Sequence, residues 1–345
     1  MASKLAADPR IDPRLKALLG GWGDPPAPRN VASRQELVDQ ENSPAALAAA
    51  AAFAAMGPAF DNEVNAPSAG LAPMTTHELV SAPDGNRIKI AFVRPDTAKT
   101  APCVYYIHGG GMAFSSCFEA HYRAWARIIA ANGVAVVMVD FRNCGRPSSA
   151  PELAPFPAGL NDCASGLKWL HAHAAELNID PARIVVAGES GGGNLTLALG
   201  LKLKQDGELG LIKGLYALCP YLAGQWPQDR YPSSMENNGL LLDLHSNRGA
   251  MAYGIEAFEA GNPLAWPGFA TVDDVAGLPP TVISVNECDP LRDEGIAFYR
   301  LLLQAGVSAR GREVLGSIHG TEIFSIACPD ISRDTARDLA GFCRG

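Results

Sequence analysis

The chain has 345 residues, 48% of them apolar, and its 28 basic and 36 acidic side chains give a formal net charge of −8. This apolar fraction is ample for a large buried core, and the acidic balance disfavours nucleic acid and anionic membrane surfaces as partners. The eight cysteines have no regular spacing, and Met1–Lys4 leads into charged, proline-containing sequence without the apolar stretch of a signal peptide. We therefore expect reduced thiols and a cytoplasmic protein with no nucleic-acid partner and no stable membrane anchor.

Residues 1–75 are predicted to be helical and rich in alanine. Ser43 and Pro44 precede the alanine run 45–55, and Gly57 follows it. A serine cap, a proline at the first helical position and a glycine after the last turn are the usual signals of a helix. The run is too short and too weakly apolar to span a bilayer. Two roles stay open for it: a helix packed on the core, and part of a lid.

A hairpin, a strand and a glycine loop follow. Apolar and polar residues alternate along 77–93 on either side of the turn 83–86, and this pattern predicts a hairpin. Residues 104–107 are a strand-like apolar run. Directly after that run comes His108-Gly109-Gly110-Gly111, whose glycines leave the backbone N–H groups uncovered. Alone, this is a flexible loop. At the end of a strand, its N–H groups can point at the oxygen of a tetrahedral intermediate.

The middle of the chain continues the alternation of strands and helices. Residues 134–139 and 211–218 are predicted strands, and 159–177 is a predicted helix with Trp169 and Leu170 on its inner face. From about residue 100 onward the alternation shows no linker. This pattern indicates a single α/β core.

The most specific motif is Gly188-Glu189-Ser190-Gly191-Gly192, between the apolar run 183–187 and the helical pattern 194–199. Strand, tight glycine turn and helix are the setting in which G-x-S-x-G forms a nucleophile elbow. Glycines two positions on either side avoid collisions in the strained turn, and the helix N-terminus favours developing negative charge. Ser190 is the predicted nucleophile, and the Gly191 N–H is a predicted donor to the oxyanion.

About 60 residues separate Cys219 from Pro280, far more than an ordinary connection. We interpret a stretch at about 221–270 as a cap insertion above the carboxyl ends of the strands. A pair of ordinary core helices is the alternative. Bulky residues in this stretch and beside the glycine loop are candidates to shape an acyl or alcohol pocket: Trp226, Tyr231, Trp266, Met112 and Phe114.

Two loops near the C-terminus complete the candidate site. Residues 280–285 are a predicted buried strand, and Asp289 follows at its carboxyl end, where open parallel sheets place their sites. Folds with a nucleophile elbow use the chain order serine, acid, histidine. Of the seven histidines only His319 lies beyond Asp289, after another candidate strand at 309–314. Asp293 is a rival for the acid, but we expect it in the first turn of the next helix, where acids suit the helix dipole.

Together these motifs resemble the hormone-sensitive-lipase-like esterases, a family of α/β-hydrolases. The similarity covers roughly residues 75–345, and the matching segments are 108–111, 156–162, 188–192, 289–294 and 319–320. It implies an α/β-hydrolase fold, with a mostly parallel central sheet flanked by helices and a helical cap. It also implies two parts: an N-terminal helical part of the cap at 1–75, and a catalytic domain at 76–345 that carries the insertion.

The resemblance implies a role for each motif residue. Ser190 is the implied nucleophile, Asp289 the acid and His319 the base, while His108 supports the glycine loop. Glu189 either supports the same loop or is a solvated turn carboxylate. No cofactor is expected, because the sequence has no metal-binding motif. The implied oxyanion donors are the backbone N–H groups of Gly110, Gly111 and Gly191.

Three positions depart from the family's pattern. Gly191 stands where the family usually has alanine. The segment 141–143 reads Phe-Arg-Asn where the family has Tyr-Arg, and Thr321 follows the His-Gly pair where an aromatic or apolar residue is usual. These changes leave the three predicted catalytic residues intact, so they bear on the subfamily and its substrate.

The leading prediction is hydrolysis of small, short- to medium-chain carboxylic esters through an acyl-enzyme. Hydrolysis of an amide, carbamate or lactone by the same residues is one alternative. Another is a non-catalytic ligand-binding protein of the same fold, like the family's hormone receptors. Those receptors lack a working histidine, so His319 argues for catalysis. A homodimer is left open.

Overall fold

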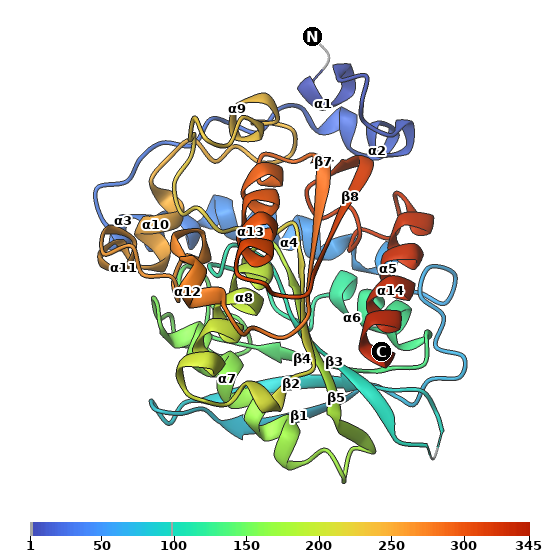
Figure 1. Cartoon of the computed structure of the whole chain (residues 1–345). Coiled ribbons are helices and arrows are strands. Elements are labelled where there is room, and N and C mark those ends of the chain that lie inside the picture. The colour runs from blue at the N-terminus through green and yellow to red at the C-terminus, as the bar shows by residue number, and fades with distance from the viewer. Residues whose placement is uncertain (1–2, 98) are drawn as a thin grey trace.

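The computed structural model describes residues 3–97 and 99–345, and its centre is one eight-stranded sheet (Figure 1). The strand order is β1-β2-β4-β3-β5-β6-β7-β8. The pairs β1–β2 and β2–β4 are antiparallel, and the remaining pairs are parallel. The strands are Thr75–Val80 (β1), Arg87–Val93 (β2), Ala101–Ile107 (β3), Ala135–Asp140 (β4), Ile179–Glu189 (β5), Gly214–Leu218 (β6), Thr281–Cys288 (β7) and Ala309–Ile318 (β8).

Helices cover both faces of this sheet (Figure 1). Because the central parallel strands are buried on both sides, they read as continuous apolar runs. On β3, Val104 and Tyr106 pack into the layer of α6 and α14, whereas Tyr105 and Ile107 pack into the layer of α7, α8 and α13. These helices are Ala120–Ala130 (α6), Pro329–Arg344 (α14), Ala158–Ala172 (α7), Gly191–Gln205 (α8) and Arg292–Gln304 (α13).

Three predicted elements have different ends in the structure. The helix expected to reach residue 177 ends at Ala172, where the ring of His173 bonds to the Trp169 carbonyl at 2.8 Å. Trp169 is half-buried: it packs against the hydrophobic core, as predicted, and it also stacks on His173. The strand expected from residue 211 begins at Gly214, after the 3-10 turn Leu209–Leu211 (η2). Gly57 begins a further short helix instead of ending the chain's helical run.

The region 221–270 is an insertion of short helices between β6 and β7. It contacts an N-terminal helix, α3 (Arg34–Glu41). Arg248 pairs with Glu41 at 2.8 Å, and the Arg34 guanidinium donates to the Ala252 carbonyl. The helices from the insertion to β7 are Ser233–Glu236 (α9), Arg248–Tyr253 (α10), Ile255–Glu259 (α11), Pro267–Phe269 (η3) and Val272–Val275 (α12).

Residues 3–22 lie elsewhere, beside the ends of β7 and β8 (Figure 1). Leu5, Ile11 and Leu15 pack in one cluster with Cys288 and Ile318, the last residues of those two strands. The N-terminal region is therefore divided between the insertion and the C-terminal strands. The short elements at its start are Lys4–Ala7 (α1), Pro13–Leu19 (α2) and Gly20–Trp22 (η1).

The predicted alanine helix is present as α4 (Pro44–Ala55), and the Ser43 hydroxyl caps it by accepting from the Ala46 N–H. None of its residues is buried, and α5 (Gly57–Phe60) follows it. Within the described residues, no single helix has the length and apolar character to cross a bilayer. Arg34–Glu41 and Pro44–Phe60 reach that length and composition only as a pair, with a 52° bend between them.

Candidate active site

The predicted site residues converge at one edge of the sheet. His108 follows β3, Ser190 follows β5, Asp289 follows β7 and His319 follows β8. In the strand order, β3 adjoins β5, β7 adjoins β8, and only β6 lies between the two pairs. Parallel strands bring their carboxyl ends to the same edge, so loops far apart in sequence meet there.

Ser190 occupies a strained turn between β5 and α8. Its φ of 57° and ψ of −120° lie outside the ordinary regions for a residue with a side chain. The Ser190 N–H donates to the Leu218 carbonyl at 2.9 Å, and its own carbonyl accepts from the N–H groups of Asn194 and Tyr221. These bonds maintain the strained conformation, and the serine remains half-exposed. The strand, tight turn and helix predicted around Ser190 are thus present.

The backbone of Gly191 approaches the glycine loop very closely. A Cβ at position 191 would lie 2.6 Å from the Met112 nitrogen and 2.7 Å from the Gly111 nitrogen. Alanine there would force these segments apart, which explains why this chain has glycine where the family usually has alanine. Gly110 and Gly111 have φ of 91° and 61°, a region that favours glycine. The structure therefore brings the backbones of Gly111 and Gly191 close together.

Glu189 supports the glycine loop from beneath. Its carboxylate accepts from the Gly109 N–H at 2.6 Å, from the Tyr106 hydroxyl at 2.5 Å and from the Tyr122 hydroxyl. The side chain is buried, so the alternative of a solvated turn carboxylate is wrong. Burial raises the pKa of Glu189 to about 7, although the two tyrosine hydroxyls and the Gly109 N–H favour the charged form.

His108 is a neutral packing residue of the same loop. It is fully buried and stacks on Phe141, with ring centroids 4.3 Å apart. Its Nδ1 lies 3.0 Å from the Gly109 carbonyl oxygen, and its Nε2 lies 3.6 Å from an Asp140 oxygen. Burial lowers the pKa of the imidazole, although Asp140 opposes this. Phe141, one of the departures from the family, thus provides an aromatic face for the loop histidine.

Asp289 and His319 form a buried pair. His319 Nδ1 lies 2.7 Å from Asp289 Oδ2, and Asp289 Oδ1 accepts from the Leu291 N–H at 2.9 Å. Burial, the largest single effect, lowers the pKa of His319, but the Asp289 carboxylate and the Cys219 sulfur together outweigh it and raise that pKa. Thr321 closes the histidine turn, because its hydroxyl donates to the Ile318 carbonyl at 2.8 Å and accepts from the Ile318 N–H.

The rival acid, Asp293, does not face the histidine. It lies in the first turn of α13, as predicted, where it accepts from the Ser233 N–H at 2.7 Å and pairs with Arg292 at 2.9 Å. Both oxygens of the Asp293 carboxylate are therefore occupied by these partners. Asp289 is therefore the acid that the geometry brings to His319.

Cys219 stands beside the pair. Its sulfur, an Asp289 oxygen and a His319 ring nitrogen all lie within 4.8 Å of one another. Burial raises the pKa of the thiol to about 11, against the effect of His319, so the sulfur keeps its proton at neutral pH. Both Asp289 oxygens already accept hydrogen bonds. A metal ion here would have to displace the thiol proton and the hydrogen bonds to both Asp289 oxygens.

The predicted pocket residues are divided between surface and core. Met112 is buried in the glycine loop, and Phe114 beyond it is 42% exposed, with the Arg146 guanidinium 5.2 Å from its ring centroid. Trp266 is wholly buried, and its ring contacts Trp226, Tyr221 and Tyr253. Trp226 and Tyr231 are almost wholly buried. Because Trp266 is wholly buried, we do not expect it to contact the substrate directly. Any effect of Trp266 on substrate binding would pass through its neighbours.

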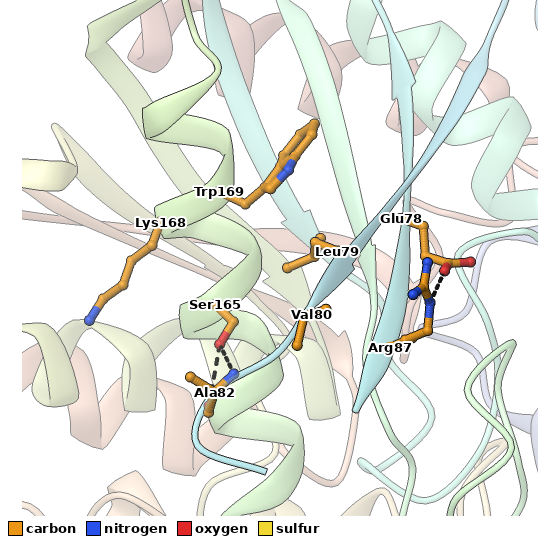
Figure 2. Close-up of a pocket in the computed structure, with 8 residues that line it drawn as sticks. All are labelled: Glu78, Leu79, Val80, Ala82, Arg87, Ser165, Lys168 and Trp169. Atoms are coloured by element: carbon orange, nitrogen blue, oxygen red, sulfur yellow. Dashed lines mark hydrogen bonds and ion pairs between the residues drawn. The ribbon is translucent and has the colours of Figure 1, made fainter. Parts of the chain in front are cut away.

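A hollow of about 470 Å³ lies at the β1 edge of the sheet, between β1, β2 and α7 (Figure 2). Figure 2 shows the Glu78–Arg87 ion pair on one side of it and Lys168 and Trp169 on the helix opposite. None of the predicted site residues lines it. The site is therefore identified by the convergence of its chemical groups and not by this hollow.

Several residues that support the site were not predicted. Tyr106 and Tyr122 hold Glu189, Cys219 adjoins His319, and Asn237 donates to the Asp289 carbonyl at 3.0 Å. A tyrosine in a buried strand requires a hydroxyl partner, so Tyr106 carried a usable signal. Cys219 and Asn237 carried none, because their partners are distant in sequence.

Comparisons with known proteins identify the family of this chain. A family model described as the alpha/beta hydrolase fold matches residues 104–323. Carboxylesterase NlhH of Mycobacterium tuberculosis is 32% identical over 253 residues, which cover 72% of this chain and 76% of that protein. Esterase LipI of the same species is 30% identical, with coverage of 75% and 77%.

Solved structures extend the similarity to almost the whole chain. Esterase Est22, whose structure is solved, is 62% identical in sequence to this chain. The two structures match with a TM-score of 0.96, and the match covers 99% of this chain and 100% of that one. Brefeldin A esterase, described as a bacterial homologue of human hormone sensitive lipase, is 34% identical with a TM-score of 0.85, covering 98% and 94%. The chain therefore belongs to the alpha/beta hydrolase fold family, and it is a carboxylic ester hydrolase similar to the hormone-sensitive-lipase-like esterases.

Proposed function

We propose that Ser190, His319 and Asp289 are the catalytic triad of this ester hydrolase. The observation that carries the proposal is the 2.7 Å contact between His319 Nδ1 and Asp289 Oδ2, at the sheet edge where the strained Ser190 turn also lies. This contact fixes the imidazole tautomer, with Nδ1 protonated and Nε2 free to act as a base. Nucleophile, base and orienting acid are the three parts that acyl transfer needs.

The acylation step uses each group once. Ser190 Oγ attacks the ester carbonyl carbon while His319 takes the hydroxyl proton. The oxyanion accepts hydrogen bonds from the N–H groups of Gly110, Gly111 and Gly191, and each such donor typically contributes about 3 kcal/mol to the transition state. His319 then gives its proton to the leaving alcohol, so the C–O bond to the alcohol breaks as the acyl-enzyme forms.

Deacylation repeats these steps with water. His319 removes a proton from the water, whose oxygen attacks the acyl carbon, and the same three N–H groups hold the second oxyanion. Ser190 leaves with the proton that His319 returns. Asp289 stays ionised in both halves and stabilises the imidazolium. Glu189 acts on this cycle only through the position of the glycine loop.

We also propose that the substrate is an ester with a short to medium acyl chain. Met112 and Phe114, directly after the glycine loop, provide bulk beside the reacting carbonyl and limit the acyl side. The expected optimum is about two to six carbons, the range that the family resemblance implies. The decline beyond it should be graded, because each methylene contributes at most about 1–3 kcal/mol.

The test is kcat/KM for soluble p-nitrophenyl esters from acetate to palmitate. A maximum at short acyl chains supports the proposal. A maximum at ten carbons or more, or a rate that jumps above the substrate's micelle threshold, would make the enzyme a lipase. Replacing Phe114 by alanine should move the optimum to longer chains, and Phe118, half-buried just beyond the same loop, serves as the matched control.

The cap is proposed to consist of the N-terminal part, residues 1–75, and the insertion at about 221–270. The contacts of α3 with α10 support this for one segment of the N-terminal part. A location in the cytoplasm and a homodimer stay predictions.

A further inference from the structure

The turn that carries Asp289 is held from behind by a buried asparagine. Asn237, just after α9, has no exposed surface. Its Nδ2 donates to the carbonyl oxygens of Asp289 at 3.0 Å and Glu287 at 3.1 Å. One amide group thus fixes the backbone on both sides of Cys288. The position of this backbone determines where the Asp289 carboxylate meets His319.

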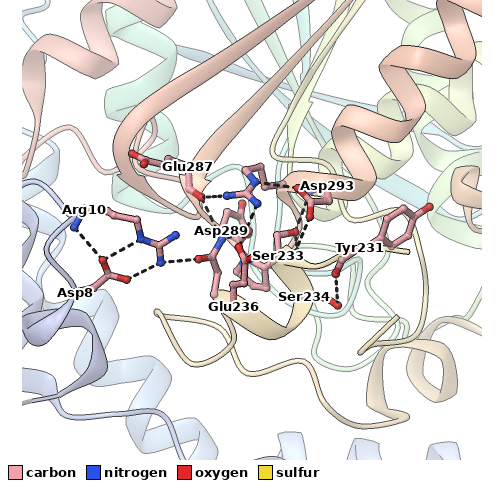
Figure 3. A network of polar contacts seen from close by, with 12 residues as sticks. Asp8, Arg10, Tyr231, Ser233, Ser234, Glu236, Glu287, Asp289 and Asp293 are labelled. Atoms are coloured by element: carbon pink, nitrogen blue, oxygen red, sulfur yellow. Dashed lines mark hydrogen bonds and ion pairs between the residues drawn. The ribbon is translucent and has the colours of Figure 1, made fainter. Parts of the chain in front are cut away.

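The orientation of that amide is set by the N-terminal segment. Arg10 Nη2 donates to Asn237 Oδ1 at 2.9 Å, and the same guanidinium pairs with Asp8 at 2.6 Å (Figure 3). Arginine can only donate and carbonyl groups can only accept. The oxygen of Asn237 must therefore face Arg10, and its nitrogen must face the two carbonyls. Every polar group of the Asn237 side chain has a partner in this arrangement.

The same segment also reaches the histidine loop. The Asp12 N–H donates to the Gly316 carbonyl at 2.9 Å, three residues before His319. Gly316 in turn donates its N–H to Glu287 Oε2 at 2.7 Å. Ile11, between the two contacts, is 2% exposed and packs in the cluster of Cys288 and Ile318. Residues 8–12 therefore contact the backbone of the histidine loop directly, and they reach the backbone of the Asp289 turn through Asn237.

We propose that Arg10 and Asn237 are positioning residues for the catalytic acid: Arg10 orients the Asn237 amide, and this amide holds the Asp289 turn in register with His319. The inference rests on the proposed function, because it assigns the support of the proposed acid. Neither residue touches the substrate. Their effect passes through the Asp289–His319 contact, and small displacements of catalytic groups reduce rates strongly.

The chain contains its own control for this proposal. The sequence Asp-Pro-Arg occurs twice, at 8–10 and 12–14, and each arginine pairs with the aspartate of its own motif. Arg14 reaches Asp330 at the start of α14, at 2.7 Å, where both side chains are largely exposed. The two arginines thus form similar local pairs, but only Arg10 reaches the acid turn.

The experiment compares Arg10→Ala with Arg14→Ala in the full chain, using p-nitrophenyl acetate. Arg10→Ala should lower kcat about tenfold with KM within about twofold, a loss typical of a misplaced catalytic group. Arg14→Ala should leave kcat within about twofold although it removes a comparable ion pair. Arg10→Lys, which keeps a donor and the charge, should recover most of the lost kcat.

A second readout does not depend on turnover. In proton NMR, the His319 Nδ1 proton bonded to Asp289 gives a low-field resonance, and Asn237→Asp should shift or broaden it, because a carboxylate would face two carbonyl oxygens. If Asn237→Asp does not fold, Arg10→Ala provides the same measurement.

The proposal fails if Arg10→Ala and Arg14→Ala change kcat equally, or if Arg10→Ala lowers only the melting temperature while kcat and the resonance stay unchanged. In either case, loss of activity in Ser190→Ala would still support the proposed catalytic triad. Conversely, normal turnover of Ser190→Ala would show that the proposed function itself is wrong.

Discussion

The two halves of the proposed site are held in place in different ways. The nucleophile half, Ser190 with the glycine loop 108–111, is supported mainly from within the α/β core. The Glu189 carboxylate accepts hydrogen bonds from Tyr106 of β3, from Gly109 just after β3 and from Tyr122 of α6.

The acid–base half is supported from outside that core. Asn237, from the insertion, and Arg10, which is 227 positions away from it, hold the turn of Asp289. Apart from the Tyr221 N–H, which reaches the Ser190 carbonyl from the start of the insertion, the nucleophile half is therefore held by the α/β core, whereas the acid–base half depends on Asn237 of the insertion and Arg10 of the N-terminal segment. Changes in the N-terminal segment should accordingly affect the second half and leave the first unchanged.

The largest expected effect tests the nucleophile half. Ser190→Ala should fold normally and lose roughly 10⁶-fold in kcat, since removal of a triad serine eliminates the covalent route. Initial rates on p-nitrophenyl acetate and a thermal melt measure both properties. A serine-directed organophosphate should add one adduct to the unmodified protein, at Ser190. An adduct elsewhere, or near-normal turnover of the variant, would place the nucleophile in another residue.

The next effect tests the acid–base half. Asp289→Asn should lower kcat about 10⁴-fold, because an amide can favour the wrong imidazole tautomer and cannot stabilise the imidazolium. Asp293→Asn, four residues later, should cost far less, since its carboxylate bonds to Ser233 and Arg292. The ratio of the two kcat values decides the assignment. The reverse ranking would make Asp293 the acid.

A smaller effect is expected for the support of the glycine loop. Glu189→Gln should lower kcat roughly 10- to 100-fold with little change in KM, less than the 10²–10³ typical for loss of an oxyanion donor. The physical reason is that glutamine has one accepting oxygen where three donors converge on the carboxylate.

Steady-state kinetics check this prediction, with Glu208→Gln as the control. Glu208 is half-exposed and pairs with Lys168. Equal effects of the two variants would mean that Glu189 does not position the loop.

The smallest effect concerns stability and pH. Glu294 is buried in the first turn of α13 and accepts from the Leu222 N–H and the Trp226 indole. Burial raises its pKa from 4.5 to about 8, against these hydrogen bonds. Between these values the folded protein holds a proton that the unfolded chain has lost, so unfolding releases it. The free energy of unfolding therefore falls as pH rises, by at most about 1.4 kcal/mol per unit.

Glu294→Gln should flatten this dependence, and Glu189→Gln should do the same up to about pH 7, where burial places the pKa of Glu189. Urea unfolding between pH 5 and 8 measures the slopes. Parallel curves for the variant and the unmodified protein would show that Glu294 titrates at its ordinary pKa. The two variants also extend the comparison, because one carboxylate lies in each half of the site.

Local patterns were sufficient to predict most of the nucleophile half. The elbow 188–192, the loop 108–111 and the strands before them were recovered, with boundaries shifted by a few residues. The end of the predicted strand 280–285 pointed to Asp289 and chain order then pointed to His319, and the structure brings these two together at 2.7 Å. Such features are predictable because a tight turn requires glycine at fixed spacings and a buried strand requires apolar residues.

Other features depended on residues that meet only in the folded chain. The close approach of Gly191 to Met112, the burial of Glu189 and the neighbourhood of Cys219 and His319 have no local signature. The N-terminal region was predicted as one part of a cap. The structure divides it, with α3 against the insertion and residues 3–22 beside β7 and β8.

The sequence by itself determined the fold class, the nucleophile elbow and the order serine, acid, histidine, because these follow from spacing along the chain. Only the tertiary structure decided which residues support them. The repeated motif Asp-Pro-Arg shows the reason: Arg10 and Arg14 have the same neighbours in sequence, yet one contacts Asn237 and the other Asp330. The partner of a side chain is set by the surface against which its segment packs, and that surface exists only after residues hundreds of positions apart have come together.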